Sequence, residues 1–264
     1  MNTPGPRTLD RAHHPSWWWR RRLDPDHSLG LRLTLAAAAA FLVLVPFALL
    51  ALLVLGGWAP LHRLDATVTD ALHGYAVDHP AWVAVMRIWT EVFAPMPLRA
   101  VALLVVIWLL RRGARRLALW VTTTMVVGGL IGPLLKLLVG RDRPDLLDPV
   151  ARAAGYAFPS GHALNATLTG GVLLMVLLPY ARRGRWRVAL WVAALLVAAL
   201  TGLSRVALGV HWASDVLGGW LLGTAVVAAT TAAFTSWRAH TGLRPVQPTT
   251  EGVAPEVERH PEAT

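Results

Sequence analysis

The sequence contains no cysteine and little charge. The absence of cysteine excludes disulfides, cysteine-bound zinc, iron–sulfur clusters and a thiol nucleophile. Charged residues make up 15% of the 264 residues, whereas an average soluble domain has roughly 25%. Hydrophobic residues reach 55%, and the mean hydropathy is +0.49. This composition argues against soluble, disordered and fibrous proteins and favours an integral membrane protein.

Lysine is almost absent as well. Arginine supplies all but one of the 25 basic residues, and Lys136 is the single lysine. The net charge of +10 could suit a nucleic-acid-binding protein, but the basic residues form short clusters between apolar runs. Because that distribution is typical of membrane insertion, we expect no nucleic-acid partner.

Six apolar runs approach the length of about 20 residues that a helix needs to cross a bilayer. We therefore predict an all-α polytopic membrane protein with transmembrane helices at 33–55, 94–110, 117–135, 163–178, 189–203 and 212–234. Residues 33–235 would form one domain, and the segments 1–32 and 236–264 would be flexible cytoplasmic tails. Within the segment 61–93, apolar residues at helical spacing predict a short helix lying on the outer surface.

The basic residues also predict the orientation in the membrane. With the N-terminus inside, the inner segments hold 17 basic residues and the outer side holds eight. The positive-inside rule then places both termini in the cytoplasm of a cell-membrane protein.

Five of the outer cations lie in two loops, against that rule. They are Lys136, Arg141, Arg143 and Arg152 after the third span, and Arg205 at the fifth. Pairing with headgroup phosphates would explain a single outer arginine such as Arg152, but it explains the whole set poorly. Ionisable groups at membrane depth are costly and usually functional, so we expect the site at the outer ends of helices three to six.

Residues suited to binding an anion share these loops. The segment Ser160–His162 precedes the fourth span, so a hydroxyl and backbone N–H groups would lie at a helix N-terminus, where phosphate binds readily. Lys136, Arg143 and Arg205 supply three positive charges, which suits a multiply charged anion. The loops show neither the carboxylate spacing of a magnesium site nor the histidine spacing of a zinc site. We therefore expect no metal and no cofactor.

His211 and Asp215 lie four residues apart, so on a helix their side chains would meet. The carboxylate would fix one tautomer of the imidazole and leave the other ring nitrogen free to attack. A histidine at a helix start that is capped by an aspartate is the less favoured interpretation of this pair alone. A second imidazole, His162, beside the same cations favours a nucleophile and a general acid.

Three motifs occur in order over residues 136–215. Lys136 to Pro144 fits K-x(6)-R-P, residues 159–162 are P-S-G-H, and Ser204 to Asp215 fits S-R-x(5)-H-x(3)-D. Each motif alone is a weak signal, but their order and spacing on a six-span chain are specific. The chain resembles the type 2 phosphatidic acid phosphatase superfamily, in particular its membrane lipid phosphatases of the undecaprenyl-diphosphate-phosphatase type.

This resemblance implies a role for each matching residue. His211 would be the nucleophile that forms a phosphohistidine, Asp215 would orient it, and His162 would protonate the leaving oxygen and then activate water. The residues that would hold the phosphate oxygens are Lys136, Arg143, Ser160, Gly161 and Arg205. Positioning and charge stabilisation are most of what phosphoryl transfer requires. The resemblance assigns no role to Arg141 or Asp142, and we expect Asp142 to pair with Arg141 or Arg143.

A site near the outer interface suits a lipid whose phosphate lies in the headgroup layer. The resemblance therefore implies a lipid phosphatase acting on a polyprenyl diphosphate, phosphatidic acid or phosphatidylglycerol phosphate. The six-span architecture favours the undecaprenyl-type diphosphate slightly, by analogy alone.

Several other functions stay open. A phosphotransferase would pass the phosphate to a lipid or sugar acceptor instead of water. A non-catalytic lipid-binding scaffold or a transporter is less favoured, because the charges lie at the span ends and no transporter-type repeat is visible. The superfamily also includes the vanadium haloperoxidases, but six apolar spans argue against a relative that is soluble. The sequence leaves the substrate, the oligomeric state and the role of 61–93 undecided.

Overall fold

A computed structural model describes residues 28–147 and 149–240 of the chain. The predicted tails lie largely outside these residues, since 1–27 and 241–264 are not described. The described part is all helical, without strands, as predicted. Helix α2 already begins at Ser28 and helix α9 ends at His240, so both extend into the segments that we predicted as tails.

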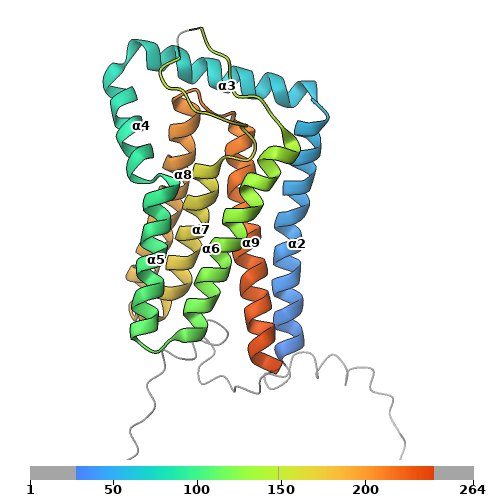
Figure 1. Cartoon of the computed structure of the whole chain (residues 1–264), viewed down its shortest axis with the longest axis vertical. Helices are drawn as coiled ribbons and strands as arrows, with labels where there is room; N and C mark the ends of the chain where they lie inside the picture. The colour runs from blue at the N-terminus through green and yellow to red at the C-terminus, as the bar shows by residue number, and fades with distance from the viewer. Residues whose placement is uncertain (1–27, 148, 241–264) are drawn as a thin grey trace, which may run out of the picture.

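The described α-helices form a bundle with one helix lying across its end (Figure 1). They are α2 (Ser28–Leu55), α3 (Ala59–Asp78), α4 (Pro80–Val92), α5 (Pro95–Arg111), α6 (Arg115–Val139), α7 (Gly161–Leu177), α8 (Gly184–Ala207) and α9 (Ala213–His240), with a short 3-10 helix at Leu178–Tyr180. Helix α9 packs against α2 and α7, and α7 packs in turn against α8. Helix α3 crosses the end of the bundle opposite to the first residues of α2 and the last residues of α9.

The bundle has the lengths and the surface of a multi-pass membrane protein. In the described part of the chain, five helical segments are long and apolar enough to cross a bilayer, namely Pro80–Arg111, Arg115–Val139, Gly161–Tyr180, Gly184–Ala207 and Ala213–Phe234. Counting the bent pair of α2 and α3 as one span gives six, the predicted number. Large apolar side chains face outward, with Leu104 65% and Leu130 67% exposed. Exposing so much apolar surface to water would be unfavourable, whereas the lipid chains of a bilayer can cover it.

The segment 61–93 is two helices rather than one. Helix α3 is the helix that the apolar spacing predicted, and it lies across the end of the bundle because the chain bends by 91° between α2 and α3. Its place on the outer surface stays a prediction. Helix α4 then turns back along the bundle and leads into α5 after a break at Phe93 and Ala94. Prolines open both α4 and α5, where the missing N–H costs nothing.

Helices α6 and α8 end beneath α3, and helices α7 and α9 begin there. The site therefore lies at this end of the bundle. Helix α6 stops at Gly140, whose left-handed backbone (φ 61°) turns the chain away while its N–H bonds to the carbonyl of Lys136. The loop that follows leads into α7, and the short turn after Ala207 leads into α9. An apolar cluster that includes Phe47, Phe158 and Leu222 packs next to these ends.

Candidate active site

The structure brings the predicted site residues to the end of the bundle that α3 covers (Figure 1). They come from the last turns of α6 and α8, the loop after α6, the first turns of α7 and α9, and the turn before α9. In chain order these residues are Lys136, Arg143, Ser160, Gly161, His162, Arg205, His211 and Asp215. Their roles in a reaction stay a prediction.

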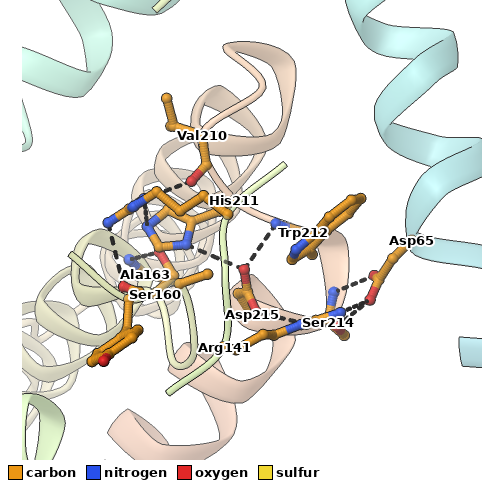
Figure 2. A network of polar contacts seen from close by, with 12 residues as sticks. Asp65, Arg141, Ser160, Ala163, Val210, His211, Trp212, Ser214 and Asp215 are labelled. Carbon is orange, nitrogen blue, oxygen red and sulfur yellow. Dashed lines mark hydrogen bonds and ion pairs between the residues drawn. The ribbon is translucent and has the colours of Figure 1, made fainter. Parts of the chain in front are cut away.

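His211 and Asp215 form a buried pair, as their spacing predicted (Figure 2). The imidazole Nδ1 lies 3.3 Å from Asp215 Oδ2, and the two residues are 2% and 0% exposed. The same carboxylate oxygen accepts the backbone N–H of Trp212 at 2.9 Å. Asp215 therefore reaches back to the residue that precedes α9, as the third residue of a helix does in a capping box. Its orientation does not depend on His211 alone.

Arg143 identifies the tautomer of His211. Its Nη1 lies 3.2 Å from His211 Nε2, and a guanidinium can only donate. Nε2 is therefore the acceptor, and the ring proton sits on Nδ1, facing Asp215. Burial lowers the pKa of His211 to about 4, outweighing the raising effect of Asp215. The imidazole is thus neutral near pH 7, and the lone pair of Nε2 accepts the hydrogen bond from Arg143.

Two of the predicted phosphate ligands donate to backbone carbonyls of the loop before α7. Arg143 Nε bonds to the carbonyl of Gly155 at 2.8 Å, and its Nη2 bonds to that of Ala154 at 3.0 Å. Lys136 Nζ bonds to the carbonyl of Tyr156 at 2.6 Å. Burial also lowers the pKa of Arg143, although the guanidinium stays charged. These carbonyls occupy donors that a phosphate would use.

Arg205 and His162 complete the cationic side of the site. Arg205 is 9% exposed, and its Nη1 donates to Thr90 Oγ1 of α4 at 2.9 Å. Its Nε has no hydrogen-bond partner in the part of the chain that is described. His162 is half-buried and lies within electrostatic range of Arg205, His211 and Arg143.

The first residues of α7 are fastened to the start of α9. The Ser160 N–H donates to the backbone carbonyl of Asp215 at 2.9 Å, and the Ser160 hydroxyl accepts the N–H of Ala163 at the start of α7. On α9, Gly219 permits this approach, because a Cβ there would lie 2.6 Å from the carbonyl oxygen of Ser160. His162 and His211 therefore sit on two helix ends that are held in register.

Three residues that the motifs did not single out belong to the same network: Asp65, Arg141 and Ser214 (Figure 2). Arg141 pairs with Asp65 and with Asp215 at 2.7 Å each. Arg143 bonds to His211 and to backbone carbonyls. Among the described residues, Asp142 therefore pairs with neither Arg141 nor Arg143, contrary to the expectation. Asp142 instead offers its backbone carbonyl to the indole of Trp212. One signal could have indicated Asp65, namely a carboxylate among the apolar positions of the predicted surface helix.

The charges of this cluster favour an anion. Four cations face two carboxylates, which leaves a net charge of +2 on Lys136, Arg141, Arg143, Arg205, Asp65 and Asp215. Among residues 28–147 and 149–240, no three histidine, aspartate or glutamate side chains gather as metal ligands would. Action without a metal stays a prediction. The cluster can bind a dianionic phosphate and present to it a neutral, oriented imidazole.

Several phosphatases are among the known proteins that this chain resembles. The chain is 32% identical over 123 residues to undecaprenyl-diphosphatase of Sulfolobus acidocaldarius. This match covers 44% of this chain and 54% of the relative. It is 39% identical over 97 residues to phosphatidylglycerophosphatase B of Bacillus subtilis, covering 36% and 46%. It is 36% identical over 122 residues to lipid A 1-phosphatase of Rhizobium etli, covering 40% and 48%. The chain thus spans about half the length of these curated relatives.

A solved structure shares the fold. The crystal structure of a transmembrane PAP2 type phosphatidylglycerolphosphate phosphatase from Bacillus subtilis superposes with a TM-score of 0.65 at 24% identity. The match covers 79% of this chain and 99% of that one. The model of the PAP2 superfamily matches residues 117–239, which include all three motifs. The resemblance seen in the sequence is therefore confirmed over residues 117–239, the part of the chain that matches the PAP2 superfamily.

Proposed function

We propose that this chain is an integral membrane lipid phosphatase that transfers a phosphate first to His211 and then to water, without a metal. The observation that carries the proposal is the geometry of His211, whose Nδ1 faces Asp215 and whose Nε2 accepts from Arg143. The names of the relatives, all phosphatases of lipids or lipid diphosphates, support the release of phosphate from a lipid.

The first step would be an in-line attack. His211 Nε2 forms a bond to phosphorus, the bond from phosphorus to the leaving oxygen breaks, and His162 gives that oxygen its proton. The phosphorylated imidazole then carries a positive charge, which the carboxylate of Asp215 offsets. Arg143 would turn its Nη1 from His211 to the phosphate, freeing the lone pair as the substrate binds.

The second step would regenerate the site. Neutral His162 takes a proton from water, the water oxygen bonds to phosphorus, and the bond to His211 Nε2 breaks. Throughout, Lys136, Arg143 and Arg205 would hold the equatorial oxygens, where the charge of the transition state is spread. The backbone carbonyls that now accept from Lys136 and Arg143 would be replaced by phosphate oxygens.

A cavity of about 440 Å³ offers a path for the lipid. Leu53, Val54 and Leu61, where α2 bends into α3, line its apolar side, and Arg143 lines its polar side. A lipid chain in this cavity would run from the bilayer toward Arg143, the residue that contacts His211. We propose that Leu53→Trp raises KM for long-chain substrates while leaving a short soluble phosphomonoester unaffected. Leu196→Trp, at a lipid-facing position on α8, is the matched control.

The orientation belongs to the proposal as well. Basic residues are in excess on the side of the bundle where α2 begins and α9 ends. This excess supports a protein of the cell membrane whose two chain termini lie in the cytoplasm. The site would then face outward and act on the outer leaflet. The candidate substrates are a polyprenyl diphosphate, phosphatidic acid and phosphatidylglycerol phosphate.

The test is phosphate release by the purified full chain in detergent with EDTA. Undecaprenyl diphosphate, phosphatidic acid and phosphatidylglycerol phosphate are assayed side by side, with His211→Ala and the exposed His79→Ala as matched variants. We expect release that disappears only in His211→Ala, with acid-labile phosphate trapped on the wild-type protein. Unchanged release by His211→Ala would overturn the mechanism. Trapped phosphate without release would indicate a phosphotransferase that needs an acceptor.

A further inference from the structure

Helix α9 carries no N-cap side chain of its own. The residue before its first turn is Trp212, whose indole has no acceptor. The N–H of Ser214, two residues on, bonds instead to Asp65 Oδ1 of α3 at 2.9 Å. The Ser214 hydroxyl donates to the other carboxylate oxygen of Asp65 at 2.5 Å. A carboxylate 149 residues away in the sequence thus does what a capping residue does locally, and it does so in the turn that holds Asp215.

Asp65 also holds the arginine that contacts Asp215. Arg141 Nη2 donates to Asp65 Oδ2, and Arg141 Nη1 donates to Asp215 Oδ1, both at 2.7 Å. The two carboxylates are 1% and 0% exposed, and the arginine side chain is 13% exposed. Buried charges are costly unless they are paired and hydrogen-bonded, so each member depends on the others.

The charge of this trio bears on catalysis. Two carboxylates and one guanidinium leave a net charge of −1 beside His211. Without Asp65, the guanidinium of Arg141 would neutralise Asp215 alone, and the trio would become neutral. Asp215 would then stabilise the positive phosphohistidine less well. The −1 charge is restored if the charge of Arg141 is removed at the same time.

We propose that Asp65 is a positioning residue for phosphoryl transfer, acting on Asp215 and His211 through Arg141 and Ser214. This inference rests on the proposed phosphatase activity. Asp65 contacts neither His211 nor the predicted phosphate ligands in the described structure, so its removal should lower kcat and leave KM nearly unchanged.

The experiment compares Asp65→Asn, Asp65→Asn/Arg141→Gln and the control Asp70→Asn, an exposed position on the same helix. Asparagine keeps an acceptor for the Ser214 N–H, and glutamine keeps a donor for Asp215. We expect Asp65→Asn to lower kcat about 10- to 100-fold, the effect of losing one charge-assisted hydrogen bond. The kcat of the double variant should be at least about ten-fold higher than that of Asp65→Asn. A purely structural role of Asp65 could not produce this recovery.

Two controls keep the outcomes distinct. The proposed function itself is tested first, before any Asp65 variant is considered. Phosphate release by the wild-type protein must be lost in His211→Ala. The thermal midpoint of each variant in detergent reports folding. The inference is overturned if Asp65→Asn matches Asp70→Asn in kcat, or if the double variant is no faster than the single one. If Asp65→Asn does not fold, the kcat of the double variant tests the inference instead. A double variant whose kcat is as low as that of His211→Ala overturns the inference.

Discussion

A methyl group at Gly219 would test whether the starts of α7 and α9 must hold their register for catalysis. A Cβ at this position would lie 2.6 Å from the Ser160 carbonyl oxygen and 2.9 Å from the Cβ of Ala163. To reach the 3.4 Å at which ordinary contact begins, the start of α7 must move by about 0.8 Å. The backbone carbonyl of Ser160 cannot rotate away as a flexible side chain could.

That displacement reaches the site directly. The bond from the Ser160 N–H to the Asp215 carbonyl, now 2.9 Å, would lengthen by up to about 0.8 Å and weaken or break. His162 would shift against His211 by a similar distance. Since a misplacement of about 1 Å costs on the order of 100-fold in rate, we expect kcat of Gly219→Ala to fall about 100-fold. Overpacking should also destabilise the protein by about 1–3 kcal/mol.

Gly170→Ala is the matched control, because its Cβ would lie 3.5 Å from the Cβ of Ala194, an ordinary contact. The assay is lipid phosphate release in detergent, with the thermal midpoint measured on the same samples. We expect Gly170→Ala to retain wild-type activity and stability. If Gly219→Ala is as active as Gly170→Ala, the register between the two helices does not matter for the reaction, and our reasoning is refuted.

Three further predictions follow from the site. Activity should persist in EDTA and be inhibited by vanadate, which can take the trigonal-bipyramidal shape of the transition state; loss in EDTA with rescue by Mg²⁺ would contradict this. Burial lowers the pKa of His211 to about 4, so the nucleophile should stay neutral well below pH 6.5. The acid limb of kcat/KM should then lie below pH 6.5 after correction for the substrate phosphate, whose second pKa is about 6; a limb at 6.5 that belongs to the enzyme would contradict it. Lys136→Ala should lower kcat/KM at least about 100-fold and leave the thermal midpoint intact, because within the described residues its Nζ donates to loop carbonyls; a protein that no longer folds would show that Lys136 supports the structure.

Most of the candidate site could be predicted from the chain alone. Apolar runs dictate membrane helices, because backbone groups in lipid must bond within their own segment. Once the number of crossings is known, the loops after the third and fifth spans must emerge on the same side. The motif residues at those loops, from Lys136 to Asp215, therefore had to meet at one end of the bundle.

The partners of Arg141 could not be predicted in this way. Its neighbour Asp142 was the obvious candidate, yet the guanidinium bonds to Asp65, which is 76 residues away. The choice depends on the 91° bend between α2 and α3 and on the direction in which α3 then crosses the bundle. No local propensity encodes that direction, since it follows from packing against α8 and α9.

The sequence by itself therefore determined the membrane helices, the end of the bundle that holds the site and the residues of the three motifs. Only the tertiary structure decided that α3 covers this end and that Asp65 caps α9. Only the fold, too, showed that Nε2 of His211 is the acceptor nitrogen, because that depends on where Arg143 lies. The physical reason is that hydropathy and motif spacing act along the chain, whereas burial and charge pairing act between segments that only packing brings together.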